Sequence, residues 1–307
     1  MKLLIPLAVL LLFIDCDNNS NLSLIEQSSK SKNKFEATND HAVNRQPEID
    51  SIKYNLAWLD SFKVENTLIN RVEVPVGFKR FRKKEGSFPH WIRRLPLKEG
   101  NPKVMLYNGE EKWNQEANAF VFDLDVGDRD LQQCADAVMR IRAEYLFHTQ
   151  QYNKIHFNYT NGALVQYSKW RNGNYPIPKG KSVYWVRKEK CNESYKSFKT
   201  YMVQIFNYAG THSLSKELTS IKYNDMQIGD ILIYGGFPGH TVMVVDLVVN
   251  EQTKEKKFLL AQSYMPAQDF HILKKPSSDS PWYDLNKESI IDTPEWSFDS
   301  SQLMRWN

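Results

Sequence analysis

Two apolar runs rich in β-branched residues flank a glycine-rich turn at residues 226–246, MQIGDILIYGGFPGHTVMVVD. The runs DILIY and HTVMVVDLVV have the composition of strands, and the turn GGFPG brings the second run back beside the first. A charged turn, NEQTKEKK, then leads to a third apolar run, FLLAQSY. The sequence therefore predicts an antiparallel meander with His240 at the head of its middle strand.

The strongest helical pattern precedes this meander, in DRDLQQCADAVMRIRAEYLF at residues 128–147. Asp130 followed by Gln133 is a capping-box pattern, which places Cys134 in the first or second turn. The apolar stripe has the spacing of three and four typical of a helix and consists of Leu131, Cys134, Val138, Ile141 and Tyr145.

Five further segments have recognisable patterns. SYKSFKTYMVQIFNYAG predicts an amphipathic helix with Gly210 as its C-cap, and SFPHWIRRLPLK predicts a short helix. LINRVEVPVGFKRF and ANAFVFDLDVG predict strands, while the polar tail PWYDLNKESIIDTPEWSF is expected to wrap the surface. Helices and antiparallel strands together predict an α+β fold.

The N-terminus indicates export. An apolar run from Leu3 to Ile14 follows one lysine, and it is too short to span a bilayer comfortably, so a secretion signal is favoured. Cys16 comes directly after it, which resembles a bacterial lipoprotein signal, in which that cysteine is acylated. Asp15 replaces the usual small residue, so a soluble secreted protein and an uncleaved anchor remain alternatives. The prediction is a protein of the cell envelope, lipid-anchored on the periplasmic or surface side.

The expected organisation is a signal peptide at 1–16, a flexible polar tether at 17–52 and one globular domain at 53–307. The tether carries almost no large apolar residues, so it cannot bury enough surface to offset the entropy lost on ordering. The whole chain has 307 residues and a formal net charge of +4, and no recognition motif accompanies this charge. A nucleic-acid partner is therefore not expected.

Residues 79–98 concentrate positive charge. This basic segment is either a solvated face or a contact with an anionic surface or polymer outside the cell. Its eight cationic residues are Lys79, Arg80, Arg82, Lys83, Lys84, Arg93, Arg94 and Lys98.

Cys134 and His240 are the residues best suited to nucleophilic chemistry. A thiol becomes a good nucleophile as thiolate, and a helix N-terminus or a nearby imidazolium favours that form. The imidazole then needs a third polar group to hold its tautomer. Gln262 lies on the strand expected to return beside His240, so its side-chain carbonyl is the candidate.

Residues 226–246 resemble the histidine-bearing half of papain-like cell-wall hydrolases of the Nlp and CHAP types, where a Gly-Asp strand precedes a Gly-His pair. QCADAV resembles their cysteine-bearing helix. The resemblance implies a papain-like core in which Cys134 is the nucleophile, His240 the base and Gln262 the orienting residue. Because about a hundred residues separate Cys134 from His240, it also implies an insertion at about 148–222. Gln133 stands where those hydrolases often carry an aspartate.

A second resemblance covers nearly the whole mature chain. DLQQCADAVMRIRAEYLF, YAGTHSLSKEL and FLLAQSYMPAQDFHILK with the later SPWY are similar to the bacterial family called domain of unknown function 4846. Its members are mostly exported lipoproteins, and the family has no established activity. Mechanism therefore rests on the residues themselves.

Substrate contacts are predicted at Gly239 and Tyr264, beside the histidine and the glutamine, and at Trp170. The glycine-rich turn would leave room beside His240 for a substrate backbone. Trp170 and its aromatic neighbours form either a glycan platform or the core of the insertion. No metal-ligand spacing is found among the histidines and cysteines, and no cofactor is expected.

Two functions follow from these features. The first is an extracytoplasmic cysteine peptidase or amidase acting on cell-wall peptide. The second is a non-catalytic envelope lipoprotein that binds a glycan or polyanion. Cys134 could also be a core residue or form a disulfide with Cys191. A separation of Cys134 from His240 beyond about 6 Å, or burial of both from solvent, would favour the binding function. The oligomeric state is not predicted.

Overall fold

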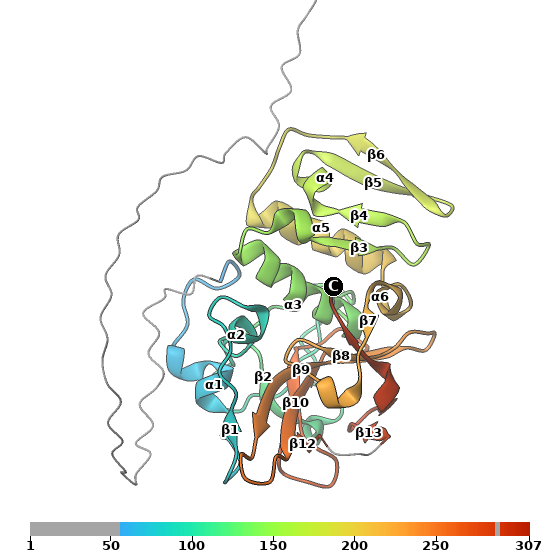
Figure 1. The fold of residues 1–307 in the computed structure, drawn as a ribbon. Helices are drawn as coiled ribbons and strands as arrows, with labels where there is room; N and C mark the ends of the chain where they lie inside the picture. The colour runs from blue at the N-terminus through green and yellow to red at the C-terminus, as the bar shows by residue number, and fades with distance from the viewer. Residues whose placement is uncertain (1–55, 286–288) are drawn as a thin grey trace, which may run out of the picture.

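The computed structural model describes residues 56–285 and 289–307. The predicted signal peptide at 1–16 with Cys16, and the predicted tether at 17–52, lie outside the described residues. Helices and strands are mixed, so the predicted α+β class is confirmed (Figure 1).

A nine-stranded antiparallel sheet forms the centre of the molecule. Its main order is β2-β11-β10-β9-β8-β15-β7, with β1 (Lys79–Arg80) on β9 and β12 (Trp282–Asp284) on β10. The strands β8 (Ile231–Tyr234), β9 (His240–Val249) and β10 (Lys256–Gln262) are consecutive neighbours, which confirms the predicted meander. All ten residues of β9 are buried, because this strand lies in the middle of the sheet.

The helix α3 (Cys134–His148) packs against β9 and separates the sheet from the segment at about 148–222 that is predicted to be an insertion (Figure 1). The structure differs from the predicted start of this helix. The N-cap is Gln133 rather than Asp130, and the capping box pairs Gln133 with Asp136. Cys134 is therefore the first helical residue, inside the predicted first turn.

The segment after α3 forms a layer on the far side of this helix from the sheet (Figure 1). It contains two hairpins, β3 (His156–Asn158) with β4 (Leu164–Gln166) and β5 (Asn174–Lys179) with β6 (Ser182–Arg187). Its helical elements are η3 (Tyr152–Lys154), α4 (Tyr167–Arg171), α5 (Tyr195–Tyr208) and α6 (Thr211–Glu217).

The structure corrects the predicted role of Gly210 as a helix C-cap. The predicted helix is α5, but its C-cap is Ala209, and Gly210 is the N-cap of α6 with an extended backbone. Gly210 N–H donates to Ser213 Oγ at 3.1 Å. The prediction failed because a second helix begins directly after the first, so glycine marks a junction between two helices.

The N-terminal part of the domain is less extended than predicted. LINRVEVPVGFKRF was expected to be a strand, but it contains α1 (Leu68–Arg71) and the two-residue β1. The short helix with proline in its first turn is confirmed as α2 (Phe88–Ile92), and the next predicted strand is confirmed as β2 (Asn118–Val121). Single turns η1 (Val64–Asn66), η2 (Gln115–Ala117) and η4 (Tyr223–Asp225) and the short β7 (Thr219–Ser220) complete the connections.

The tail at 281–298 contributes to the core, which corrects its expected place on the surface. Its strand β12 pairs with β10, and its buried apolar residues are Trp282, Tyr283, Ile291 and Phe298. On either side of this tail, β11 (His271–Leu273) joins β10 to β2, and β15 (Leu303–Arg305) joins β8 to β7. Between them lie the hairpin β13 (Ile290–Asp292) and β14 (Ser297–Asp299) and the turn η5 (Ser300–Gln302). Phe298 and Leu303 are fully buried. Isolated apolar residues in a polar segment can fill a core when the strands around them supply the rest of it.

Candidate active site around Cys134 and His240

Cys134 lies against the start of β9. The backbone N–H of Thr241, the residue after His240, points to the Cys134 sulfur, as do the N–H groups of Cys134 and Ala135 at the start of α3. A helix N-terminus and three N–H donors favour a thiolate. Burial opposes it more strongly, and the nearby Asp136 adds to the opposition, so the pKa of the Cys134 thiol is raised to about 12. The resting sulfur is therefore a neutral thiol.

His240 sits in an aromatic cage. Its ring centroid lies 4.8 Å from that of Tyr264, 5.5 Å from Trp296 and 5.9 Å from Phe298. Burial lowers the pKa of His240 to about 4, although the hydrogen bond with Gln262 acts in the opposite direction. The imidazole is therefore neutral at pH 7. Only 6% of Cys134 and 1% of His240 is exposed.

A buried chain of polar contacts leads away from the imidazole. His240 Nε2 lies 2.7 Å from Gln262 Oε1, and Gln262 Nε2 donates to Glu295 Oε2 at 2.6 Å. Glu295 in turn forms an ion pair with Lys112. Both members of this pair are almost fully buried, with side-chain exposures of 3% for Glu295 and 1% for Lys112.

This chain determines the tautomer of His240. A carboxylate only accepts hydrogen bonds, so Glu295 requires the NH₂ group of Gln262 to face it. The amide oxygen of Gln262 then faces the ring, and it accepts a proton from His240 Nε2. The neutral imidazole therefore carries its proton on Nε2 and leaves Nδ1 as a free lone pair. A lone pair at Nδ1 is what a general base needs.

The loop before Cys134 is held by buried polar groups. Arg140 Nη1 donates to Gln132 Oε1 at 2.7 Å, and Gln132 Nε2 donates to the Asp125 carbonyl at 3.2 Å. Ser263 Oγ lies 3.1 Å from the carbonyl of Gln132, so the residue after Gln262 is tied to the loop that precedes the cysteine. This link holds the end of β10 and the start of α3 together.

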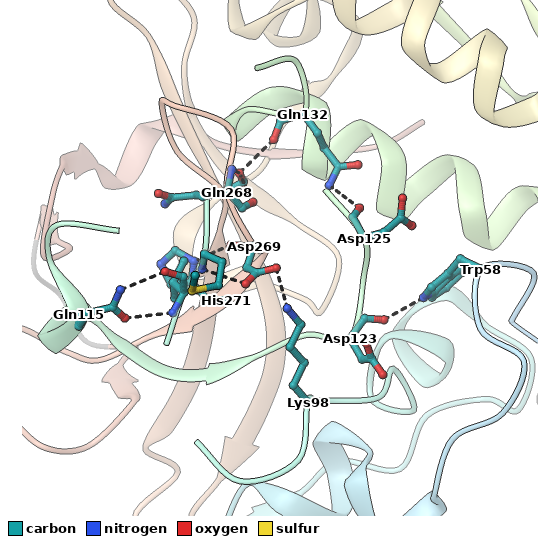
Figure 2. A network of polar contacts seen from close by, with 12 residues as sticks. Trp58, Lys98, Gln115, Asp123, Asp125, Gln132, Gln268, Asp269 and His271 are labelled. Carbon is teal, nitrogen blue, oxygen red and sulfur yellow. Dashed lines mark hydrogen bonds and ion pairs between the residues drawn. The ribbon is translucent and has the colours of Figure 1, made fainter. Parts of the chain in front are cut away.

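The polar network of Figure 2 continues from Gln132 and Gln268 to Asp269 and His271. Asp269 accepts hydrogen bonds from Lys98 Nζ at 2.9 Å and from the backbone N–H of Met105 at 3.0 Å. His271 Nδ1 donates to the carbonyl of Asp269 at 2.9 Å, and burial lowers the pKa of His271 to about 3. His271 is therefore a neutral structural residue that pairs with Gln262 across β11 and β10.

The structure places His240 against both Gln262 and Tyr264, and it places Cys134 at the backbone N–H of Thr241, the next residue along β9. Trp170 lies inside the insertion, 1% exposed, where its ring packs 4.1 Å from Tyr175 and its N–H donates to Ser197 Oγ at 3.1 Å. Its place is that of a core residue, which was the alternative for this aromatic group.

Gly239 has a packing role that differs from the expected one. A Cβ at this position would lie 2.2 Å from Thr211 Oγ1 and 2.5 Å from the Gly236 carbonyl. The space beside Gly239 is thus filled by α6 and by the turn itself. The glycine allows the turn to approach α6, and it does not open room for a substrate backbone.

Lys112, Glu295 and Trp296 were missed by sequence reasoning. Glu295 and Trp296 lie in the turn of the β13–β14 hairpin, more than thirty residues after Gln262 in the chain. Acidic and aromatic residues in a polar tail have no spacing that relates them to the histidine. Only the return of the tail to the sheet places them there.

Several other expectations concern chemistry at or near the site. Cys134 is a free thiol, so the disulfide with Cys191 is not formed. Within residues 56–285 and 289–307, no group of three or more histidine, cysteine or acidic side chains is placed to hold a metal ion. Over the same ranges no helix is both long enough and apolar enough to cross a membrane.

Comparison with known families gives one match. The family model described as "Domain of unknown function (4846)" covers residues 68–305 of this chain. The chain belongs to this family. The matched range includes the sheet, α3 and the hairpin that carries Glu295, so the whole candidate site lies within the family's domain. No curated protein and no solved structure matches the chain.

Proposed function

We propose that this member of the domain of unknown function 4846 family is an exported, lipid-anchored cysteine hydrolase with a papain-like core. Its reaction would be acyl transfer from an amide, with cell-wall peptide as the substrate. One observation carries the proposal: the backbone N–H of Thr241 is directed at the sulfur of Cys134, so the start of β9, where Gln262 holds His240 in the tautomer with a free Nδ1, lies against the first residue of α3. The lipid anchor rests on the N-terminal sequence around Cys16.

The proposed mechanism starts from the neutral thiol of Cys134 and the neutral imidazole of His240. Cys134 passes its proton to His240 Nδ1 as its sulfur attacks the amide carbonyl, and the backbone N–H of Cys134 stabilises the oxyanion. His240 then gives this proton to the leaving amine, which departs and leaves a thioester on Cys134. A water molecule loses a proton to Nδ1 and attacks the thioester. The acid product leaves, and the proton returns to the sulfur.

Access to the pair would require a local opening. Tyr264 and Trp296 cover the His240 ring, and both are only half-buried. Tyr264 precedes the exposed Met265, and Trp296 belongs to the turn of a two-stranded hairpin. These segments are the ones that would move when a substrate enters.

The decisive experiment follows turnover of a soluble cell-wall peptide digest by mass spectrometry. The full chain should release a new amine, and both Cys134→Ser and His240→Ala should abolish release while circular dichroism shows that each variant remains folded. His212→Ala, on α6, serves as the control and should retain activity. Failure of the parent to cleave any component, or activity retained by either site variant, would overturn the proposal.

A thiol-labelling experiment tests the pair without a substrate. The raised pKa of Cys134 predicts slow alkylation by iodoacetamide near neutral pH. Trp296→Ala should uncover the site and speed labelling of Cys134 relative to the parent. Adding His240→Ala should remove part of that gain, because the base is lost. Equal labelling rates with and without His240 would argue against a functional pair.

Burial of both residues favours a second candidate, a non-catalytic envelope lipoprotein that binds a glycan or polyanion. A resting pair sealed by aromatic rings, with a thiol pKa of about 12, is also what a structural core would have. Under this function Cys134→Ser would leave every measured property except thiol labelling unchanged. The turnover experiment therefore separates the two.

A further inference from the structure

Two adjoining cavities lie beside β1, away from the candidate site. Their volumes are about 520 Å³ and 550 Å³, and they share Arg80, Phe81 and Arg82. Six lysines and arginines line the first cavity, and the second adds three more. Glu85 and Glu251 are the acidic residues of the two linings, and Glu251 is already paired with Lys79. We refer to the two cavities together as the basic groove.

Arg80 and Arg93, which line the groove, belong to a buried ion cluster. Asp246 has a side-chain exposure of 0%, and it accepts hydrogen bonds from Arg80 Nε at 2.6 Å and from Arg93 Nε at 2.7 Å. Two guanidinium groups therefore share one carboxylate, and the cluster carries one uncompensated positive charge. Backbone carbonyls of Phe81 and Leu247 accept the other hydrogen bonds of Arg93, so its charge is fixed in place.

The loop at the mouth of the groove adds cations without carboxylate partners. Within residues 56–285 and 289–307, none of Arg82, Lys83 and Lys84 has an acidic group within ion-pair distance. Lys83 is half-buried, and its pKa is lowered by burial and by repulsion from Arg93, which outweigh the opposite effect of Asp246 and Asp230. Half-burying a cation beside a positively charged cluster costs free energy unless an anion compensates it.

We propose that the basic groove binds a short chain of phosphate groups. Guanidinium groups match phosphate oxygens, and lysines supply adaptable point charges around them. Two cavities joined through Arg80 and Arg82 favour a ligand with several phosphates in a row over a single anion. The ligand would neutralise the excess charge of the Arg80–Asp246–Arg93 cluster and of Lys83.

This site is separate from the cysteine and histidine. Asp246 lies six residues along β9 from His240, a separation of roughly 20 Å at about 3.3 Å per residue. Binding in the groove therefore does not depend on whether Cys134 is catalytic. The two proposals can fail independently.

The test is isothermal titration of the full chain with tripolyphosphate, and with inorganic phosphate for comparison. Tripolyphosphate should bind with an affinity that falls as salt is raised, and inorganic phosphate should bind more weakly. The triple variant Arg82→Ala, Lys83→Ala, Lys84→Ala should lose about tenfold or more in affinity. The matched triple variant Lys179→Ala, Lys181→Ala, Lys190→Ala removes the same charge from the insertion and should change affinity by less than about twofold.

Three outcomes would overturn the proposal. The first is no binding of tripolyphosphate by the parent. The second is an equal loss in both triple variants, because binding would then follow net charge and not the groove. The third is binding to vesicles containing an anionic phospholipid without binding of tripolyphosphate, which would assign the segment to a membrane surface. Arg80→Ala would break the buried ion pair with Asp246, so the loop variants carry the test.

Discussion

His240 Nε2 lies 2.7 Å from Gln262 Oε1, and both side chains are buried at the end of adjacent strands. The direction of this hydrogen bond is determined by Glu295. Its carboxylate accepts a hydrogen bond from the NH₂ group of the same Gln262 amide. A histidine on one strand and a carboxylate on a distant hairpin are thus linked through a single glutamine. The proton position on the imidazole is a property of this whole chain.

Glu295→Gln should loosen the tautomer of His240. A glutamine both donates and accepts, so it no longer requires Gln262 to present its NH₂ group. Nitrogen-15 NMR should show the Nε2-protonated form alone in the parent and a mixture in the variant. The variant also leaves Lys112 without its carboxylate, which should cost about 3–5 kcal/mol of unfolding free energy.

Asp284→Asn is the control for this experiment, because Asp284 pairs with two lysines at a partly exposed site on β12. It should leave the His240 tautomer unchanged. A parent protein with its proton on Nδ1 would contradict the assigned orientation of Gln262.

Acid should destabilise the fold through His240. Its pKa is lowered to about 4 from 6.5, so between these values the unfolded chain binds more protons than the folded one. The stability is complete above pH 6.5 and is lost as pH falls toward 4, by roughly 1.4 kcal/mol per pH unit. In urea unfolding, His240→Gln should therefore have a lower unfolding free energy than the parent at pH 6.5. This difference should become smaller as pH falls toward 4. His212→Gln should follow the parent, and a deficit that stays constant with pH would contradict the prediction.

Gly239→Ala should destabilise the protein strongly. The added methyl group would lie 2.2 Å from Thr211 Oγ1 and 2.5 Å from the Gly236 carbonyl, and the carbonyl belongs to the backbone of the same turn. Overpacking of this kind costs about 1–3 kcal/mol or more. Gly210→Ala is the matched control, since its backbone is extended and nothing lies within 4 Å of the added group. Thermal unfolding should separate the two, and equal melting temperatures would contradict the packing role.

Trp170→Ala should unfold or loosen the insertion. The ring is 1% exposed and packs on Tyr175 and Tyr201, so its removal should cost about 3–5 kcal/mol. Tyr184→Ala, at a side chain that is 49% exposed, should change stability by no more than about 0.5 kcal/mol. Chemical denaturation measures both. If Trp170→Ala has the same unfolding free energy as the parent, Trp170 is not a core residue, and the alternative of a glycan platform is favoured.

Local patterns in the sequence were sufficient for the meander and for the helix that follows β2. The runs that form β8, β9 and β10 are apolar and β-branched, and a charged turn separates the last two, so each strand could be recognised within its own window. The stripe through Val138 and Ile141 has the period of a helix. The helix start was misplaced at Asp130 because two overlapping patterns can cap it, and Gln133 with Asp136 forms the cap that the structure has.

The other residues of the candidate site could not be predicted from the sequence, because they come from segments without a recognisable pattern of spacing. Glu295 and Trp296 are single residues in a polar tail, and Lys112 lies in an irregular loop. Each becomes important only when strand pairing brings the tail and this loop to the edge of the sheet. A hydrogen-bond partner more than thirty residues away leaves no periodic trace in a sequence.

The sequence by itself determined which residues have suitable chemistry and where they lie on their own elements: Cys134 at a helix start, His240 at a strand start and Gln262 on the returning strand. Only the tertiary structure decided their environment. Burial lowers the pKa of His240 and raises that of Cys134, and the carboxylate of Glu295 orients the amide that holds the imidazole. Solvent exclusion and hydrogen-bond direction depend on every surrounding segment at once, so they are properties of the packed molecule.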